Sequence, residues 1–442
     1  MSDFSSVPDN WTSKKLAEVV NPHRRITYGI VQPGPRFTPE LGVPMIRGQD
    51  YSGGEVRVDD LYYVSPRLAA SFDRASVRGG DILLSIVGYV GLVAEVPEIL
   101  SGANLTQTTA RIAIQEELHS RFFLHFFRSK AFHSEVKKYM KGSAQPGLNL
   151  ADVEKMKVIF PERREEQAAI SKILDTLDTA IQETEAIIAK LKAVKQGLLH
   201  DLLTRGIDAN GELRPPQSEA PNLYKPSPLG WIPKEWDIAT LEAVSSTVTS
   251  GSRDWARFYA ESGALFVRIG NLTREHINFR FDSTIYVCPP HNADGQRTRL
   301  EPGDILISIT ADLGIVGVVP DGMGEAYINQ HIALVRPNIG AVNPRFVGHY
   351  LASPVAQAYI SKLNDAGAKA GLNLPTIRGL LTARPEHTEQ NLIAERLDEI
   401  DNRIQNATRE SAKLRDLKFG LMDDLLIGRV RVTPLLQEAQ QA

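Results

Sequence analysis

The stretch Val77-Arg78-Gly79-Gly80-Asp81-Ile82-Leu83-Leu84-Ser85-Ile86 decides the fold, because the chain uses it twice. It returns as Leu300-Glu301-Pro302-Gly303-Asp304-Ile305-Leu306-Ile307-Ser308-Ile309, a shift of 223 positions from Asp81 to Asp304. In both copies a Gly-Asp turn precedes a short apolar run, which is typical of a buried strand. We therefore expect strands over residues 82–87 and 305–309, each inside an equivalent domain.

Further matches extend the repeat over the whole chain at nearly the same shift. Gly147-Leu148-Asn149-Leu150 returns unchanged as Gly371-Leu372-Asn373-Leu374, and Pro8 and Trp11 match Pro233 and Trp236. The other matches are Tyr63-Val64-Ser65-Pro66 with Tyr286-Val287-Cys288-Pro289, Gly91 with Gly314, Pro97 with Pro320, and Gln107 with Gln330. Collinear matches of this kind indicate an internal duplication.

Each copy continues from a globular domain into a long polar helix. The spacing of four phenylalanines predicts a helix over residues 120–141 first, and then Pro161 or Pro385 precedes the long helix. Apolar residues follow at alternating steps of three and four, which is the heptad pattern of a coiled coil. The two seams are Ile170, Leu174, Leu177, Ile181, Ile188, Leu191, Leu198 and Leu202, and Ile393, Leu397, Ile400, Ile404, Leu414, Leu421 and Leu425. We expect the two helices to pair antiparallel, with Lys195 and Lys418 at equivalent seam positions.

These patterns predict an α+β fold, with two globular α/β domains separated by two long antiparallel coiled-coil helices in a pseudo-two-fold internal repeat. The predicted parts are a domain at 1–160, a long helix at 161–205, a Pro-rich extended linker at 206–230, a second domain at 231–385, a second long helix at 386–430 and a tail at 431–442. The second helix start, Pro385 to Gln390, is one residue shorter than Pro161 to Gln167. A change of helix phase there would break the two-fold relation.

The bulk composition predicts a cytoplasmic protein of several domains. The chain has 442 residues, of which 42% are hydrophobic and 23% charged, and its one cysteine, Cys288, suits a reducing compartment. The N-terminus lacks the pattern of a secretory signal, and no apolar run approaches the ~20 residues that span a membrane. The net charge of −3 is unlike that of a free-standing nucleic-acid binder, so any DNA contact must rest on local patches.

The sequence carries none of the catalytic signatures that we sought. It has no phosphate-binding G-x-x-x-x-G-K-[ST] loop, no zinc-type cluster of Cys and His, and no G-x-S-x-G motif. The Pro-Pro pairs at 215–216 and 289–290 lack the Asn/Asp-Pro-Pro-aromatic context of an amino-methyltransferase. The glycines of Gly88-Tyr89-Val90-Gly91 favour a tight turn between strands. We therefore expect a binding protein with no catalytic residue, metal or cofactor of its own.

Polar loops and a row of cations are the candidate contacts to DNA. Cations at 121, 128, 130, 137, 138 and 141 are opposed within that stretch by Glu135 alone, and a polar loop follows them. Flexible cations suit phosphates, while amides and hydroxyls suit base edges. A solvated helix face and turn capping are the alternative explanations, and Gln107 and Gln330, shared by both copies, favour a scaffold role. The candidate residues are Arg47, Gln49, Tyr51, Thr106, Thr108, Lys137, Lys138, Lys141, Ser143, Gln145, Arg268, Asn271, Arg274, Asn329, His331 and Lys369.

On these motifs the chain resembles the specificity subunit of type I restriction–modification enzymes, over essentially its whole length. The resemblance rests on the two Gly-Asp-Ile-Leu-[Leu/Ile]-Ser-Ile segments and the two Gly-Leu-Asn-Leu segments. The Pro-x-x-x-x-Glu-Gln stretch at 161–167 and the Trp-Ile-Pro-Lys-Glu-Trp stretch at 231–236 also fit. The ordered set, used twice, is specific for this family.

The resemblance implies two target recognition domains, each reading one half of a bipartite site in double-stranded DNA, with the helices as a ruler between them. It implies assembly with two modification subunits, which bind S-adenosylmethionine and methylate adenine N6. It also implies restriction subunits, which use ATP and Mg to translocate and cleave DNA. The alternatives are a DNA-independent scaffold protein for a methyltransferase and a fused enzyme that methylates or cuts by itself.

Overall fold

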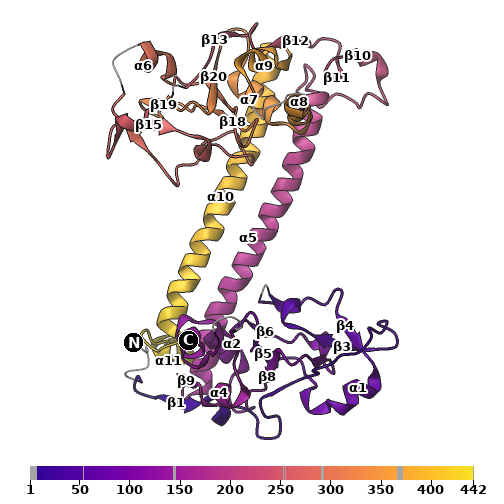
Figure 1. The fold of residues 1–442 in the computed structure, drawn as a ribbon, viewed down its shortest axis with the longest axis vertical. Helices are drawn as coiled ribbons and strands as arrows, with labels where there is room; N and C mark the ends of the chain where they lie inside the picture. Colours follow the sequence, from indigo (N-terminus) through magenta and orange to yellow (C-terminus); the bar gives the residue numbers. More distant parts are fainter. Residues whose placement is uncertain are drawn as a thin grey trace. The chain divides into compact units, whose positions relative to one another are not determined.

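The computed structural model describes residues 7–441 except 53, 143–145, 252, 254, 290–292 and 366–371. It divides into two compact units, and both draw on distant parts of the chain. Unit 1 comprises Met1–Thr184 and Arg409–Ala442, and unit 2 comprises Glu185–Thr408. Each unit therefore holds one globular domain, one segment of the long helix α5 (Arg164–Thr204) and one segment of the long helix α10 (His387–Leu425) (Figure 1).

In its described residues, the globular domain of unit 1 contains three small sheets and four short α-helices. A four-stranded sheet has the order β2-β8-β5-β6, a three-stranded sheet has the order β4-β3-β7, and β1 pairs with β9. The strands are β1 (Trp11–Lys15), β2 (Thr27–Tyr28), β3 (Val43–Ile46), β4 (Tyr62–Val64), β5 (Ile82–Ser85), β6 (Val93–Glu95), β7 (Asn104–Leu105), β8 (Thr109–Ile112) and β9 (Lys157–Pro161). The helices are α1 (Pro66–Ser71), α2 (Ser120–Arg128), α3 (Lys130–Tyr139) and α4 (Leu150–Lys155).

The globular domain of unit 2 repeats this plan. Its sheet β13-β20-β17-β18 matches β2-β8-β5-β6, its sheet β14-β16-β15-β19 contains the equivalents of β4-β3-β7, and β12 pairs with β21. The strands are β12 (Asp237–Thr240), β13 (Ser245–Ser250), β14 (Tyr259–Ala260), β15 (Ala264–Val267), β16 (Tyr286–Val287), β17 (Ile305–Ser308), β18 (Val316–Val318), β19 (Ala326–Ile328), β20 (Ile332–Pro337) and β21 (Leu381–Arg384). The helices are α6 (Ala293–Thr298), α7 (Pro344–Ala352), α8 (Pro354–Asp365) and α9 (Leu374–Gly379). The predicted duplication and the two predicted buried strands are confirmed.

The repeated Gly-Asp turn has the same cause in both units. Gly80 and Gly303 have φ angles of 81° and 84°, in the left-handed region that favours glycine. The Asp81 carboxylate accepts a hydrogen bond from the Arg78 N–H at 2.7 Å, and Asp304 accepts one from the N–H of residue 301, also at 2.7 Å. The motif therefore closes the turn that leads into β5 and β17.

The repeated Gly-Leu-Asn-Leu segment starts a short helix in each unit. The Asn149 side chain accepts a hydrogen bond from the Asp152 N–H at 2.7 Å and so caps α4. Asn373 does the same for α9, accepting from the Thr376 N–H at 2.8 Å. The leucine before each asparagine is buried. This motif thus combines a helix cap with a core contact.

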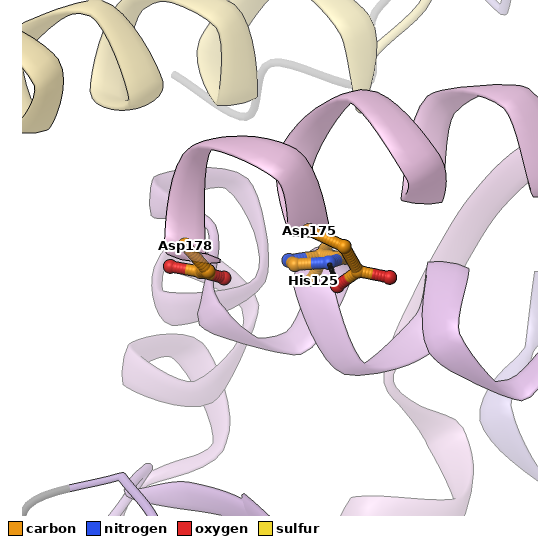
Figure 2. Close-up of side chains that lie close together, drawn as sticks. All are labelled: His125, Asp175 and Asp178. Atoms are coloured by element: carbon orange, nitrogen blue, oxygen red, sulfur yellow. Dashed lines mark hydrogen bonds and ion pairs between the residues drawn. The ribbon is translucent and has the colours of Figure 1, made fainter. Parts of the chain in front are cut away.

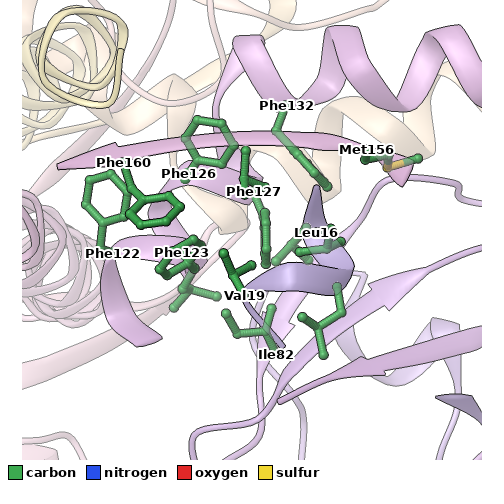
Figure 3. Packing of buried hydrophobic residues seen from close by; sticks show 14 of the residues in the cluster. Leu16, Val19, Ile82, Phe122, Phe123, Phe126, Phe127, Phe132, Met156 and Phe160 are labelled. Atoms are coloured by element: carbon green, nitrogen blue, oxygen red, sulfur yellow. The ribbon is translucent and has the colours of Figure 1, made fainter. Parts of the chain in front are cut away.

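The prediction of a single helix over residues 120–141 is wrong, because the helix is interrupted at Ser129. This residue has extended backbone angles, and its Oγ accepts a hydrogen bond from the Phe132 N–H, which starts α3. Phenylalanines on both sides of the break still enter one core, where the Phe127 and Phe132 rings lie 4.6 Å apart (Figure 3). The break therefore lets α2 and α3 pack from two directions on the same cluster.

Within each unit, α5 and α10 pack side by side in opposite directions, as predicted (Figure 1). In unit 1, Ile170 and Leu174 share a core with Met422 and Leu425. In unit 2, the core contains Leu199 and Leu202 of α5 together with Ile393 and Leu397 of α10. Early residues of α5 therefore pack with late residues of α10, and late residues of α5 with early residues of α10, as in an antiparallel pair. Between these cores the predicted seam residues Ile181, Ile400 and Ile404 are buried, whereas others, such as Ile188 and Leu414, are only partly buried.

The two long helices start in the same way despite the one-residue difference in sequence. The Gln167 side chain donates to the Pro161 carbonyl at 2.8 Å, and Gln390 donates to the Pro385 carbonyl at 2.8 Å. Both helices begin three residues before that glutamine. The shorter spacing is therefore absorbed in the preceding loop, and the helix phase is kept.

The predicted extended linker is partly folded. Near its end, β10 (Tyr224–Ser227) pairs with β11 (Gly230–Pro233), which begins at the linker's last predicted residue, and Ile207 forms an isolated bridge with Leu213. The proline-rich composition concealed this hairpin, because proline is tolerated in such an edge strand. The tail contains α11 (Thr433–Gln441). In the described ranges, none of the helices is both long enough and apolar enough to cross a lipid bilayer.

Candidate DNA-reading surface and helix junctions

Backbone hydrogen bonds bring the predicted polar segments of unit 1 into one row. Segment 106–108 has a neighbour on each side. One neighbour is the end of β3, which Arg47 follows, and the other is segment 86–87. Segment 147–148 comes next and pairs with Lys141. The bonds that form this row run from the Thr106 N–H to the Ile46 carbonyl (3.2 Å), from the Ile86 N–H to the Thr108 carbonyl (2.8 Å), from the Leu148 N–H to the Ile86 carbonyl (2.8 Å) and from the Lys141 N–H to the Gly147 carbonyl (3.0 Å).

Unit 2 builds the same row at the same places. The Asn329 N–H donates to the Val267 carbonyl (3.2 Å), and Arg268 follows that residue. The Ile309 N–H donates to the His331 carbonyl (3.0 Å), and the Leu372 N–H donates to the Ile309 carbonyl (3.1 Å). The structure therefore brings together, in both units, loops that the sequence analysis had singled out separately.

The side chains in the middle of the two rows differ. In unit 1 the hydroxyls of Thr106 and Thr108 lie 2.8 Å apart. In unit 2 the same places carry Asn329 and His331, and His331 Nδ1 lies 2.7 Å from the Thr310 hydroxyl. One backbone frame thus presents two hydroxyls in unit 1 but an amide and an imidazole in unit 2. Thr106 and Asn329 are largely buried, whereas Thr108 and His331 are half-buried.

Two arginines of the rows are held by their own turns. Arg47 donates through Nε and Nη2 to Asp50, at 3.0 and 2.8 Å, and this bond raises the pKa of the guanidinium. At the equivalent turn, the Arg268 N–H donates to the Asn271 side chain at 3.0 Å. Gln49, between Arg47 and Asp50, is exposed. Both arginines are partly exposed; the turn fixes the side chain of Arg47 but only the backbone of Arg268.

Three candidate contacts have other roles in the structure. Tyr51 is fully buried, its hydroxyl lies 2.9 Å from the Thr109 hydroxyl, and burial raises its pKa to about 12. Asn271 is buried and donates to the carbonyls of residues 280 and 283. Arg274 is held by Asp312 and by the Leu313 carbonyl at 2.7 Å. We therefore assign the buried Tyr51 and Asn271 to the scaffold of their loops and drop them as base contacts, whereas Arg274 is exposed and stays a predicted contact.

The cations of residues 121–141 fall into two groups in the structure. Arg121 pairs with Glu95 and Asp175, and Arg128 donates to the Gly54 carbonyl at 2.7 Å. Lys137 and Lys138 of α3 and Lys141 are exposed; Lys138 pairs with Glu135, and Lys141 lies 2.6 Å from Asp152. The break at Ser129 separates the two groups. Ser143, Gln145 and Lys369 lie outside the described residues.

The sequence analysis missed a polar cluster where α2 meets the long helices of unit 1 (Figure 2). His125 Nε2 and Arg121 Nε lie 2.8 and 2.7 Å from one oxygen of Asp175, while Asp178 pairs with Lys418 of α10. Burial lowers the pKa of His125, and the hydrogen bonds from His125 and Arg121 lower that of Asp175 although its burial acts in the opposite direction.

The donor atoms of His125, Asp175 and Asp178 lie within 4.8 Å of one another, as in a metal site. However, each carboxylate already has a cationic partner, so a metal ion would have to displace Arg121 or Lys418. Unit 2 repeats the cluster: Arg345 and His349 bind Asp398 at 2.6 and 2.7 Å, and Lys195 pairs with Asp401 at 2.5 Å. This recurrence favours a structural junction between each globular domain and both helices. Applying the repeat shift to His125 and Asp175 would have found it.

A second junction explains the opening Trp of each repeat. In unit 2, Glu389 accepts hydrogen bonds from the Trp236 Nε1–H at 3.1 Å, from the Ile207 N–H at 2.7 Å and from Arg214. In unit 1, Glu166 accepts from Arg431 at 3.0 Å. The opening tryptophan of each domain lies against the glycine that follows the other repeat's long helix, Gly428 for Trp11 and Gly206 for Trp236.

Comparison with known proteins agrees with this architecture. The profile of a family described as the type I restriction modification DNA specificity domain matches residues 8–193 and 293–415. The chain belongs to this family. The first matched range spans the globular domain of unit 1 and runs into α5, and the second begins inside the globular domain of unit 2 and runs into α10.

Individual relatives cover nearly the whole chain. A putative type I restriction enzyme MjaX specificity subunit from Methanocaldococcus jannaschii is 23% identical over 98% of this chain and 96% of its own length. The type I restriction enzyme MjaVIII specificity subunit of the same organism is 25% identical over 81% of each chain. The crystal structure of an S subunit of a type I restriction–modification system from M. genitalium covers 96% of this chain and 99% of its own, with a TM-score of 0.60 at 15% identity. At that identity, the likeness concerns the fold.

Proposed function

We propose that this chain is the non-catalytic, sequence-reading subunit of a type I restriction–modification complex. Each target recognition domain binds one half of a bipartite site in double-stranded DNA, and the paired helices set the distance between the halves. The observation that carries the proposal is the loop row, built twice on one backbone frame with Thr106 and Thr108 in one copy and Asn329 and His331 in the other. Two domains that read different half-sites can share one backbone frame, but their side chains must present different hydrogen-bond donors and acceptors to the bases.

The charge of the chain fits a reader that shares its DNA with partners. Lys137 and Lys141 supply exposed cations next to the row of unit 1, and phosphate contacts of this kind give affinity that falls with salt. The net charge of −3 leaves much of the phosphate neutralisation to other subunits. We therefore expect specific binding to tighten strongly when the methyltransferase partner is present. Near-equal affinity with and without that partner would contradict this point.

The partners in this proposal are two modification subunits and, in the full assembly, restriction subunits in the cytoplasm. S-adenosylmethionine, ATP and Mg belong to those partners and not to this chain. Val194 of α5 and Leu417 of α10 support two equivalent docking places: they are related by the repeat shift, and both are exposed apolar residues on long helices. Exposed apolar side chains at equivalent positions suit two copies of one partner.

Methylome sequencing tests the proposal in cells that express the presumed methyltransferase with and without this chain. We expect a bipartite motif with methyladenine in both halves, present only when the chain is present. Replacing residues 231–385 with the corresponding domain of another family member should then change one half of the motif and leave the other unchanged. The alternative is a DNA-independent scaffold for the methyltransferase. In that case the two proteins would copurify, but no motif would depend on the chain.

A further inference from the structure

Unit 2 contains a cavity of about 500 Å³ between α5, the loop of residues 273–277 and the α7–α8 pair. This volume lies within the usual range for small-molecule sites. Its apolar walls come from α5, α10, β18 and the loop, and they include Leu199, Ile277, Ile315 and Ile404. Its polar side chains come mainly from α5 and the loop, and they include Lys192, Lys195, Gln196, Arg274 and His276.

The internal repeat shows what the same place looks like in unit 1. Gly91 of unit 1 faces His133 and Val136, and Gly314 of unit 2 faces Gln357 and Ile360, so the helices that follow correspond at a shift of 224. At this shift Ala352 and Pro354 of unit 2 replace Arg128 and Lys130. On the long helices, whose shift is 223, Gln196 replaces Phe419. Ala352, Pro354 and Gln196 all line the cavity.

In unit 1 the larger side chains use this space. Arg128 donates to the Gly54 carbonyl at 2.7 Å in the loop that corresponds to residues 272–279. Lys130 Nζ lies 3.7 Å from the centre of the Phe419 ring and 2.8 Å from Asp423. Unit 1 therefore carries larger side chains at three of the places that line the cavity in unit 2. Three side chains around one space are smaller in unit 2, and the resulting open cavity with apolar walls has room for an occupant.

A different cation holds the loop in unit 2 and leaves the cavity open. Lys195 Nζ lies 2.6 Å from the Glu275 carbonyl and 2.5 Å from Asp401, so it takes over the tether that Arg128 provides in unit 1. Lys192 lies at the exposed rim, 3.7 Å from Glu275, the one carboxylate among the lining residues. Gln357 donates its two amide hydrogens to the Gly314 carbonyl at 2.8 Å and to the Leu351 carbonyl at 2.7 Å, beside the apolar wall. Among the described residues, three cations and one carboxylate line the cavity; Lys195 and Arg274 pair with Asp401 and Asp312, which leaves Lys192 and Gln196 at the rim for a ligand.

We propose that this cavity binds a small anionic ligand with an apolar body, of the class of an aromatic carboxylate. The apolar body would contact Leu199, Ile277 and Ile404, and the anionic end would face Lys192 and Gln196 at the rim. Unit 1 would not bind the same ligand, since Arg128 and Phe419 stand in its place. The inference concerns binding by this chain and does not depend on its role in reading DNA.

Ligand-observed NMR and calorimetry on the full-length chain test the site with three probes of similar shape: benzoate, benzyl alcohol and benzamidine. We expect benzoate to bind most tightly and benzamidine most weakly. Gln196→Phe and Ala352→Met fill the cavity, the first with the residue that unit 1 carries, and each should weaken benzoate binding about tenfold or more. Val194→Phe adds the same ring two residues away at an exposed position outside the lining and should leave binding unchanged.

Circular dichroism and the thermal midpoint show that each variant is folded before binding is measured. Benzoate binding that persists in both filled variants would overturn the site, and so would no detectable binding of any probe to the wild-type chain. Equal binding of benzoate and benzamidine would overturn the anionic class. Loss of binding in Val194→Phe as well would show that the filled variants act through general damage to α5, which also contradicts the proposal.

Discussion

Lys195 Nζ lies 2.5 Å from Asp401 Oδ1, and the pair recurs with the two repeats exchanged, as Lys418 with Asp178. Each lysine is 223 positions from the other lysine, and each aspartate is 223 positions from the other aspartate. Each long helix therefore supplies one lysine and one aspartate to its neighbour. Such mutual complementarity is what a self-matching contact between equivalent surfaces requires. It explains why a simple duplication yields an antiparallel helix pair.

Breaking the pair in unit 2 should destabilise the protein more than breaking the pair in unit 1. Asp401 is 1% exposed, whereas Asp178 is 25% exposed, so Lys195→Met strands the more deeply buried charge. We expect Lys195→Met to lower the free energy of unfolding by about 3 kcal/mol and Lys418→Met by less. Urea unfolding measures both. Lys192→Met, which removes an exposed lysine from the same helix, should change stability by less than about 0.5 kcal/mol, and an equal loss in all three variants would contradict the argument.

Stability should fall in mild acid because the junction histidines are buried as neutral rings. Burial lowers the pKa of His125 and His349, so the unfolded chain takes up protons at a pH where the folded chain does not. The free energy of unfolding should therefore decrease as the pH drops below about 6.5, the ordinary value for histidine. The groups that face His125 are Arg121 of α2, Asp175 and Asp178 of α5 and Lys418 of α10.

The variant that tests this is His125→Gln with His349→Gln, because glutamine keeps an N–H for the aspartate but does not titrate. Urea midpoints at about pH 7.5 and about pH 5.5 should differ less for this double variant than for the wild type. His200→Gln, at an exposed position of α5, serves as the control and should keep the wild-type difference. An unchanged pH dependence in the double variant would assign the effect to other groups.

Two glycines after the end of α5 separate backbone strain from steric conflict. Gly206 and Gly211 have φ angles of 66° and 81°, so alanine is strained at both. A Cβ at Gly206 would also lie 2.3 Å from the Trp236 ring and 2.2 Å from Glu389, whereas Gly211 has open space. We expect Gly211→Ala to cost about 1 kcal/mol and Gly206→Ala about 3 kcal/mol or more in thermal or urea unfolding. Equal losses would mean that the Trp236 junction relaxes freely.

The architecture could be predicted from the sequence because the residues that shape the backbone at turns and helix starts occur in both repeats. A turn forms at Gly80 and again at Gly303, and a helix is capped by Asn149 and again by Asn373. The nearly constant spacing within these pairs reveals the shared role. The break at Ser129 escaped because an amphipathic pattern can continue across a turn when both helices face one core. Burial of Tyr51 and Asn271 escaped as well, since a polar side chain in a loop gives no sign of which partner it will find. The ion pairs of Arg121 and Arg345 depend on aspartates about 50 positions away, which composition does not show.

The loop rows predict that single substitutions act on one half-site at a time. His331→Ala should relax base choice in the half read by unit 2, with a loss of about 1–3 kcal/mol against the wrong base, and leave the other half unchanged. Thr108→Ala should do the reverse, since Thr108 occupies the corresponding place in unit 1. Lys137→Ala, a phosphate-type change, should weaken binding to all sequences alike and reduce the salt dependence by about one charge. Methylation of a library with both half-sites randomised, by the complex carrying each variant, distinguishes these outcomes. A change in both half-sites from His331→Ala alone would mean that the rows do not read the bases separately, and the division of the site between the two domains would have to be abandoned.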